Sequence, residues 1–451
     1  MIHKFIFDGT RMVYDVHSGM LHMVDEIAWD ILDHFGSLSD EEIVGRLSRK
    51  YPEEEIQGGI EEIRELVVKK QLCSPDPLDG RYDSPRDEIV KSLCLHLAHE
   101  CNLSCSYCFA GQGKFGGSPG IMAAGVGRRA LEFLVDSSGG RKHLEVDFFG
   151  GEPLLNFDVL RMLVEYGRQL AGERGKEIKF TVTTNAVLLN SEVGAFLNEN
   201  DISVILSIDG RPEVHNAMRP FPGGAGSYDI VLKNIRSFLK SRGNRDYFVR
   251  GTFTALNPDF SSDFLHLADL GFDNISLEPV VAGSGEYYAL REDILQDIER
   301  EYEKLTRFII KMKREGRHIN FFHFNIKLDG GPCLHRRMAG CGAGSHYLAV
   351  DPEGRLYPCH QFVGREEFRL GDVFNGINRK DLVDLFSGLH LYRKENCGMC
   401  WAKFHCSGGC HANAYIYNGS LEKPYSLGCG LTRKRLECAM YLAQWKAFQP
   451  E

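Results

Sequence analysis

Three closely spaced cysteines stand in the first third of the chain, at Cys101, Cys105 and Cys108. A [4Fe–4S] cube normally takes four thiolates, one for each iron. Three thiolates in so short a segment hold three corners and leave one iron without a protein ligand. An open iron is free to chelate a substrate or a cofactor, so this spacing predicts a redox-active cluster that takes part in chemistry.

The alternative for these thiols is a zinc site, or no shared site at all. Zinc prefers four closed ligands, usually from paired Cys-x2–4-Cys units, and a single Cys-x3-Cys-x2-Cys segment fits it poorly. Of the 14 cysteines in the chain, none lies between 109 and 332 and nine lie between 333 and 438. Clustered cysteines in a reducing cytosol are usually metal ligands or catalytic groups, so we expect two metal regions flanking a metal-free scaffold.

Length and charge narrow the function classes. A chain of 451 residues is suited to two or three domains, and a formal net charge of −9 argues against a general nucleic-acid or membrane-surface binder. The first residues lack the apolar run of a secretory signal, and no apolar stretch approaches the ~20 residues that span a bilayer. We therefore expect a cytoplasmic protein with neither nucleic acid nor membrane as a partner.

Residues 91–320 alternate short apolar runs with helical patterns, which predicts an α/β scaffold. Six such repeats indicate a parallel sheet curled into a whole or partial (β/α)6 barrel. The predicted strands are Ser92–Leu97, Leu144–Phe149, Ile178–Thr183, Ser203–Ile208, Phe248–Phe253 and Asn274–Val280. Active sites of such folds lie in the loops at the C-terminal strand ends, and the three cysteines follow the first strand directly.

The regions that flank the scaffold differ from it. Residues 1–75 show short strand patterns followed by helical ones, which predicts a small α+β domain. Residues 76–90 are polar and proline-rich, as expected of a linker. Residues 321–451 mix glycine, cysteine, histidine and aromatic residues, so we expect an irregular domain in which metal clusters substitute for a large apolar core.

The cysteine motif and the motifs at later strand ends resemble those of the radical S-adenosylmethionine (SAM) superfamily. The resemblance implies SAM contacts from Tyr107, Gly151, Glu152, Thr184, Asn185, Ser207, Asp209 and Arg219. In the family, the Gly-Gly-Glu-Pro segment binds the methionyl amine and the motif that ends the fourth strand binds the ribose. An aromatic residue in the cysteine motif, here Tyr107, lies against the adenine, and Arg219 is the candidate for the SAM carboxylate.

The same resemblance implies the reaction. The open iron binds SAM, and one electron from a low-potential donor such as ferredoxin or flavodoxin breaks the sulfur–carbon bond. Methionine and a 5′-deoxyadenosyl radical result, and the radical abstracts a hydrogen atom from the substrate. The cofactor supplies the difficult chemistry while the protein orients it and excludes side reactions.

The cysteines of the tail resemble the SPASM extension of radical SAM peptide-modifying enzymes, which carries two auxiliary [4Fe–4S] clusters. Three clusters are therefore implied in all. The resemblance assigns the outer auxiliary cluster to Cys397, Cys400, Cys406 and Cys429, and the inner one to Cys341, Cys359 and Cys410. A zinc ribbon that uses Cys397 and Cys400 with two histidines, His405 and His411, is the alternative.

Ligand counting gives the tail a further meaning. Two full cubes need eight thiolates, and the motif supplies seven. Sulfatase-maturing relatives have another cysteine shortly after the first ligand, whereas the stretch 342–348 has none here. We therefore expect an open iron in the inner cluster, unless Cys333 fills the gap. Cys438 could take the place of Cys429 as a ligand. The alternative for both Cys333 and Cys438 is that they are ordinary buried thiols that bind no cluster.

An open iron beside a radical source has a use in peptide chemistry. Metal coordination deprotonates a thiol, so the inner cluster is able to bind a cysteine of the substrate. Attack of that sulfur on a carbon radical gives a thioether crosslink, with the surplus electron passing to the cluster. No general base is evident in the sequence: His360 follows a cluster ligand, but a surface position is the simpler interpretation.

The first 75 residues resemble the PqqD-like, winged-helix-like recognition domains of peptide-modifying enzymes. In those, a precursor leader adds as a strand to a sheet edge, for which Leu21–Val24 is the candidate here. A DNA-binding winged helix is the alternative, but acidic residues outnumber basic ones in this segment. The three parts together resemble the thioether-forming maturases of ribosomal Cys-rich peptides known as SCIFF.

Three functions remain open at this point. The first is an enzyme that crosslinks a cysteine sulfur to carbon in a ribosomal precursor peptide. The second is a radical SAM enzyme that oxidises one side chain of a protein, as sulfatase activators do. The third is an electron-transfer protein with three clusters and no catalytic activity, although a relay has no need of SAM-contacting motifs.

Overall fold

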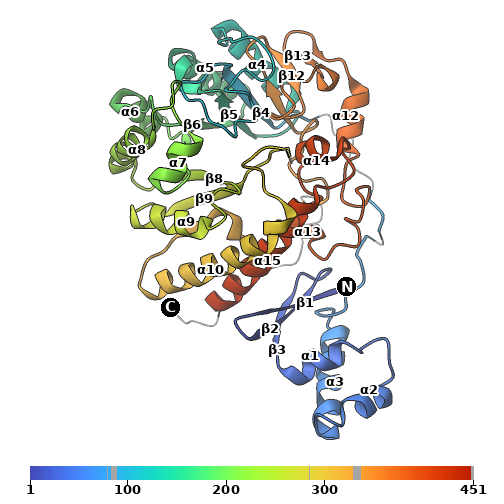
Figure 1. Ribbon diagram of the computed structural model, residues 1–451. Coiled ribbons are helices and arrows are strands. Elements are labelled where there is room, and N and C mark those ends of the chain that lie inside the picture. Colours follow the sequence, from blue (N-terminus) through green and yellow to red (C-terminus); the bar gives the residue numbers. More distant parts are fainter. Residues whose placement is uncertain (79, 83–88, 284, 329–336, 448–451) are drawn as a thin grey trace.

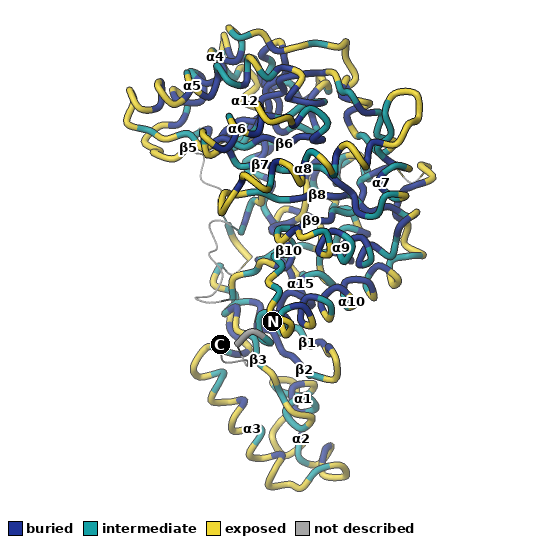
Figure 2. Tube along the Cα trace, turned by 90° about the vertical axis from the view of Figure 1, so that its left-hand side faces the viewer, coloured by how far each residue is buried: buried dark blue, intermediate teal, exposed yellow. Residues whose placement is uncertain are grey.

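The computed structural model describes residues 1–78, 80–82, 89–283, 285–328 and 337–447 (Figure 1). Its largest element is an 11-stranded sheet in the order β10-β9-β8-β7-β6-β5-β4-β11-β12-β13-β14. A second, three-stranded sheet belongs to an N-terminal unit. Buried residues concentrate along the strands and the helix faces that cover them (Figure 2).

Six parallel strands run in sequence order through the large sheet, and their predicted bounds are confirmed to within a single residue at each end. They are β4 (Ser92–Ala98), β5 (His143–Gly150), β6 (Glu177–Thr184), β7 (Ser203–Ser207), β8 (Tyr247–Phe253) and β9 (Asn274–Pro279). Every residue of β4 is buried, as expected of a parallel strand covered on both faces.

Helices connect these strands and cover the outer face of the sheet. They are α4 (Ala124–Ser137), α5 (Phe157–Glu173), α6 (Ser191–Glu199), α7 (Pro212–Met218), α8 (Tyr228–Arg242), α9 (Phe260–Asp269) and α10 (Leu295–Arg314), with short 3-10 turns at Pro153–Asn156, Glu292–Ile294, Phe322–Phe324 and Glu366–Phe368. Alternate residues of β5, Leu144, Val146 and Phe148, join the core under the helices. The residues between them face the inside of the sheet.

The sheet curls without closing. Side chains from both β4 and β9, which lie five strands apart, line one cavity, so the sheet bends around it. The outermost strands are β10 and β14, and they are not paired with each other. The scaffold is therefore the partial barrel that the strand–helix repeats predicted.

The tail is more regular than its composition indicated. Strand β11 (Tyr347–Val350) pairs in parallel with β4, and β12 (Arg355–Tyr357), β13 (Gly371–Asp372) and β14 (Gly376–Ile377) continue the sheet in antiparallel fashion. At the other edge β10 (Asn320–Phe321) pairs with β9. The sheet thus extends past residue 320, because the backbone groups on the free side of β4 find partners in the tail.

Helices complete the tail. They are α12 (Lys380–Ser387), α13 (Lys403–Cys406), α14 (His411–Asn418) and α15 (Ser426–Ala447). Leu427 and Leu431 of the 22-residue α15 share the main core with Leu305 of α10, and the Nζ atom of Lys434 lies 2.6 Å from a carboxylate oxygen of Glu303. The expectation of an irregular tail is wrong, because most of the buried apolar residues of α15 pack in the main core with α10 and so keep a long helix in place.

The N-terminal unit has the predicted order of strands followed by helices. Strands β1 (Ile2–Phe7), β2 (Thr10–Asp15) and β3 (Leu21–Val24) form an antiparallel sheet, and α1 (Glu26–Leu32), α2 (Asp40–Leu47) and α3 (Glu53–Val68) follow. Ser39 begins α2 with a capping box, in which its hydroxyl accepts from the Glu42 N–H and the Glu42 carboxylate accepts from the Ser39 N–H. Strand β3 forms one edge of this sheet.

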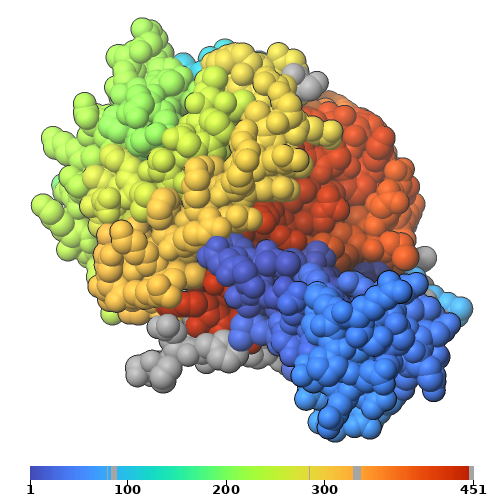
Figure 3. Space-filling view, turned by 60° about the horizontal axis from the view of Figure 1, so that its bottom comes forward, coloured from blue at the N-terminus to red at the C-terminus, as the bar shows by residue number. Residues whose placement is uncertain are grey.

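The N-terminal unit is seated on the tail (Figure 3). Tyr14 of β2 shares a small core with Phe404 and Met440, and its hydroxyl lies 2.9 Å from Nε2 of His405. Asp76, in the predicted linker, accepts a hydrogen bond of 3.0 Å from Nζ of Lys403. The part of the linker that the structure describes is therefore bound to the tail.

Within the described ranges, no helix has the length and apolar character needed to cross a membrane.

Candidate active site

A cavity of about 450 Å³ lies inside the curl, at the C-terminal ends of the barrel strands. The residues predicted for the first cluster and for SAM contacts gather around it. Those on its wall are Cys101, Cys105, Tyr107, Cys108, Gly151, Thr184, Asn185, Ser207 and Arg219. Glu152 and Asp209, from which we also expected contacts, are buried behind the wall.

The loop that follows β4 carries Cys101, Cys105 and Cys108. Its backbone is tied to the segment after α7, because the N–H of Ser104 donates to the carbonyl of Pro220 and the N–H of Ser106 donates to the carbonyl of Met218. Burial raises the pKa of Cys101 to about 12, and the Cys105 and Cys108 thiols add to the effect. The three thiols are thus close enough to interact electrostatically, and they become good ligands when a metal offsets the cost of burying thiolates.

Two glycines allow the end of β5 to approach this loop. A Cβ on Gly150 would lie 2.3 Å from the carbonyl oxygen of Ala98, and one on Gly151 would lie 2.0 Å from that of Glu100. The Gly151 N–H donates to Ala98 over 2.8 Å. A side chain at either position would push apart the two strand ends that position Cys101.

We expect Gly151→Ala to disrupt the cysteine loop. The variant should lose most of the iron of the first cluster, measured as iron per chain after anaerobic reconstitution, because the added methyl group overlaps the backbone at Glu100. Gly172→Ala is the matched control, because a Cβ at that position in α5 meets nothing within 4 Å. Wild-type iron content in Gly151→Ala would contradict this account.

Glu152 connects the ends of β5 and β6. Its carboxylate accepts hydrogen bonds from the Thr184 hydroxyl (2.8 Å), the Asn185 N–H (2.8 Å) and the Leu154 N–H (3.0 Å). Burial raises the pKa of Glu152 to about 7, although these hydrogen bonds oppose the shift. Glu152 therefore positions the end of β6 rather than facing the cavity itself.

Asn185 lies against the first cysteine. Its Nδ2 atom donates to Oδ1 of Asn102 over 2.6 Å and lies 3.7 Å from Sγ of Cys101. Its Oδ1 atom accepts from the N–H of Val187, which fixes the orientation of the amide. The motif at the end of β6 thus supports the cysteine loop directly.

Asp209 binds two other residues predicted to contact SAM. Its carboxylate accepts from the Tyr107 hydroxyl at 2.7 and 2.9 Å and from Nε of Arg219 at 3.0 Å. The Arg219 guanidinium also lies 5.3 Å from the centre of the Tyr107 ring. Asp209 accordingly holds an arginine and a tyrosine at the cavity wall.

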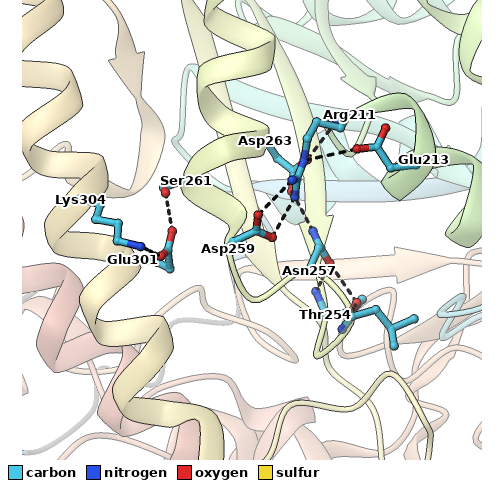
Figure 4. Close-up of polar contacts among 10 residues, drawn as sticks. Arg211, Glu213, Thr254, Asn257, Asp259, Ser261, Asp263, Glu301 and Lys304 are labelled. Atoms are coloured by element: carbon cyan, nitrogen blue, oxygen red, sulfur yellow. Dashed lines mark hydrogen bonds and ion pairs between the residues drawn. The ribbon is translucent and has the colours of Figure 1, made fainter.

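The turn after Asp209 is fixed by an ionic network (Figure 4). The N–H and Nε of Arg211 donate to the buried Asp263 at 3.0 and 2.8 Å, and its Nη atoms donate to Asp259. Gly210 has a φ of +137°, and a Cβ there would lie 2.4 Å from the Cβ of Asp263. Glycine is therefore required for the turn to approach α9 and to keep Asp209 in place.

The structure brings the tail cysteines together in the two groups that the resemblance implied. In the inner group burial raises the pKa of Cys359 to about 12, and neighbouring Cys410 and Cys341 add to the shift. In the outer group burial raises the pKa of Cys397 to about 12, with contributions from three other thiols, those of Cys406, Cys429 and Cys400. No cysteine of one group contributes to the pKa shift of Cys359 or Cys397 in the other group.

The structure answers the question of an additional cluster ligand for Cys438 but not for Cys333. Cys438 is fully buried in the core between α10 and α15, hydrogen-bonded to Thr306, so it does not replace Cys429. Cys333 lies outside the described residues. Every described cysteine is a free thiol.

The donor set fits iron–sulfur clusters. Three groups of thiols interact within themselves, and the Asn185 amide lies beside a thiol of the first group. Among residues that the structure describes, no three His, Cys, Asp or Glu side chains lie close enough to hold one metal ion together. A four-iron cube spreads its thiolates more widely than a single ion does, so this finding applies to single-ion sites such as zinc and not to cubes.

Several cavity residues were not assigned to the site by sequence analysis, although His360 was considered. Asp147, Arg250, Glu278, Tyr347 and His360 all line the cavity. His360 is not on the surface, contrary to the simpler interpretation, and its Nδ1 atom lies 3.2 Å from the Tyr347 hydroxyl. The signal for the strand residues was their alternation with apolar core residues, which indicates the inner face of a barrel strand.

A family model described as a 4Fe-4S single cluster domain matches residues 91–232, which supports a [4Fe–4S] cluster in that segment. Mycofactocin maturase MftC of Mycobacterium ulcerans is 28% identical over 346 residues, or 74% of this chain and 86% of that protein. A cysteine-type anaerobic sulfatase-maturating enzyme of Clostridium perfringens is 26% identical over 327 residues, or 69% and 85%.

Two solved structures share the fold. The structure of anSMEcpe with bound AdoMet covers 80% of this chain and 96% of its own, with a TM-score of 0.68 at 22% identity. Streptococcus suis SuiB bound to S-adenosylmethionine covers 94% and 98%, with a TM-score of 0.52 at 19% identity. The chain is therefore similar in sequence to maturases over most of its length. It shares the α/β fold of the two solved structures, with a sheet dominated by parallel strands.

Proposed function

We propose that this radical SAM protein forms intramolecular thioether bonds between cysteine sulfur and carbon in a ribosomally made, Cys-rich peptide. One observation carries the proposal. His360, directly after the inner ligand Cys359, lines the same cavity as Cys101, Cys105 and Cys108. The first and the inner cysteine groups therefore border one chamber, where a peptide is able to meet both.

The cofactors of this reaction are SAM and three [4Fe–4S] clusters. When bound, they supply a 5′-deoxyadenosyl radical, a site for the substrate thiolate and an acceptor for the surplus electron. The electron donor is a low-potential protein such as ferredoxin or flavodoxin. The structures of anSMEcpe and SuiB with bound SAM support the choice of cofactor.

The chain's own residues bind and orient these groups. Arg219 is held at the wall by Asp209, so its free guanidinium nitrogens are available to the SAM carboxylate. Tyr107, held by the same carboxylate, offers its ring to the adenine. Ser207 lines the cavity at the end of β7, within reach of a ribose.

The N-terminal unit is the proposed recognition domain. We assign residues 1–75 to binding of the precursor leader, 76–90 to the linker, 91–320 to the barrel and 321–451 to the auxiliary clusters. The free edge of β3 supports strand addition by an extended leader, in the manner of PqqD-like domains. Its exposed Met20 and Met23 offer apolar contacts beside that edge.

The missing eighth thiolate favours thioether formation over a single-residue oxidation. The described stretch 342–348, which follows Cys341 and includes the first residues of β11, contains no cysteine. The alternative is oxidation of one protein side chain, which the likeness to a sulfatase-maturating enzyme supports. A function as an electron-transfer protein without catalytic activity is disfavoured, because a protein that only transfers electrons needs no cavity beside its first cluster.

Co-expression with a small Cys-rich peptide encoded beside the gene tests the proposal. Intact mass spectrometry should show a loss of two hydrogens per crosslink, with each crosslinked cysteine resistant to thiol alkylation. The same peptide without its leader should be modified far more slowly. A peptide that keeps all its free thiols after turnover, while 5′-deoxyadenosine forms, would favour the single-residue oxidation.

A further inference from the structure

Asp147 is a carboxylate on the inner wall of the barrel that has no charged partner among the described residues. It lies on the inner face of β5 and lines the cavity. The Thr181 hydroxyl of β6 donates a hydrogen bond to it. Across the described residues, no Lys, Arg or His forms an ion pair with Asp147, although a buried carboxylate is normally paired. The SAM-contacting motifs leave this residue unused.

The position of Asp147 relates it to the inner cysteine group. Tyr347 of β11 and Cys94 of β4 are hydrogen-bonded to each other, and both are influenced electrostatically by Asp147 and by Cys359. These two side chains therefore bridge the space between Asp147 and the inner group. Asp147 faces the part of the cavity where a substrate bound at the inner group would lie.

Other charged and titratable groups face the same space. The groups around Asp147 are Glu145 on its own strand, Cys94 on β4, Tyr347 on β11 and His360 after β12. The opposite wall of the cavity carries Arg250 of β8 and Glu278 of β9. Arg250 and His323 both lie beside Glu278, at 3.8 and 3.3 Å, so Glu278 has one cation, Arg250, and a histidine partner. Asp147 is the carboxylate of this cavity that is left without one.

We infer that Asp147 is a catalytic residue that accepts the thiol proton of the substrate cysteine. This inference rests on the proposed thioether function. One electron and SAM give methionine and the 5′-deoxyadenosyl radical, which takes a hydrogen atom from the acceptor carbon. The S–H bond breaks, its proton goes to Asp147, the S–C bond forms and the surplus electron returns to the cluster. The balance per bond is one SAM consumed and one proton released.

The electrostatics of the site suit a base near neutral pH. Burial raises the pKa of Asp147 to about 6, with a further contribution from Glu145, while the Thr181 hydrogen bond opposes the shift. A base whose pKa lies close to the working pH is largely deprotonated and still binds a proton strongly enough to favour proton transfer from the thiol. Crosslinking should therefore rise with pH through about 6, as Asp147 loses its proton.

Asp147→Asn tests the role, since asparagine keeps the size of the side chain and removes its basicity. In the holoenzyme, thioether formation should fall by about 100-fold or more, while 5′-deoxyadenosine formation continues close to the wild-type rate. The rise of the remaining activity through pH 6 should also disappear. Glu145→Gln is the matched control on the same strand face, and it should crosslink normally with its acid limb moved to lower pH.

A readout independent of activity separates this role from a structural one. Folding raises the pKa of Asp147, so the folded state holds its proton more tightly and stability falls as pH rises towards 6. Asp147→Asn lacks this loss, so its melting temperature relative to wild type should be higher at pH 8 than at pH 5. An equal difference at both pH values would overturn the assignment.

The remaining outcomes are distinguishable. If the wild-type enzyme forms thioethers and Asp147→Asn forms them at the same rate at every pH, the inference is wrong and the proposed function stands. If the wild-type enzyme leaves every thiol free, the proposed function fails and this inference fails with it. If Asp147→Asn stops 5′-deoxyadenosine formation as well, Asp147 acts on the SAM site and not on the substrate thiol.

Discussion

We expect Cys105→Ala to abolish the reductive cleavage of SAM, which is the largest effect predicted for this protein. The Cys105 thiol lines the cavity and interacts electrostatically with Arg219, Asp209 and Cys108. Without it, two thiolates remain for a cube that needs three to leave a single open iron. The measurement is 5′-deoxyadenosine formed from SAM and dithionite after anaerobic reconstitution, with and without peptide.

Cys73→Ser is the control for this variant. Cys73 is exposed and lies outside all three cysteine groups, so its loss removes a thiol without touching a cluster. It should retain wild-type cleavage and wild-type iron. Because Cys105 lies in a loop whose backbone is held by Pro220 and Met218, the Ala variant should keep its fold and the iron of the tail clusters. Wild-type 5′-deoxyadenosine formation by Cys105→Ala would show that the first cluster is misassigned.

Cys410→Ala should separate the two halves of the reaction. Cys410 begins α14 and interacts electrostatically with Cys341, on the side of the tail that borders the cavity through His360. Removing it leaves the inner group with two thiolates, which is too few to hold a cube firmly. We expect SAM cleavage to continue at a reduced rate and thioether formation to stop.

Iron content and product together check this prediction. Reconstituted Cys410→Ala should hold about eight iron atoms per chain, against about twelve for three full cubes. Uncoupled 5′-deoxyadenosine with an unmodified peptide is the expected product pattern. If Cys410→Ala still makes thioethers, the substrate sulfur does not depend on the inner cluster. If it loses SAM cleavage altogether while its fold is intact, the assignment of cysteines to clusters is wrong.

Local patterns were sufficient for the scaffold. The strands from β4 to β9 are short apolar runs separated by amphipathic helices, and both signals come from side chains within one segment. The cap at Ser39 is likewise local, since the groups involved are four residues apart at most. These features depend only on interactions between residues that are close together in the sequence.

The tail was misjudged for the opposite reason. Strand β11 is only four residues long and exists because β4, far away in the sequence, offers an unpaired edge. Helix α15 buries Leu427, Leu431 and Cys438 in a core that it shares with α10. Neither the edge nor the opposing helix is visible in the local sequence, so composition alone indicated irregularity.

The sequence by itself determined which residues are available for the chemistry. These are Cys101, Cys105 and Cys108 with their spacing, and the Gly-Gly-Glu-Pro motif that carries Glu152 at a strand end. Tertiary structure alone decided what faces the cavity. It set Glu152 and Asp209 behind the wall as residues that position others, and it placed Asp147 and His360 on the wall. The physical reason is that spacing along the chain defines a set of ligands, whereas the side on which a side chain lies depends on the register and curvature of strands distant in sequence.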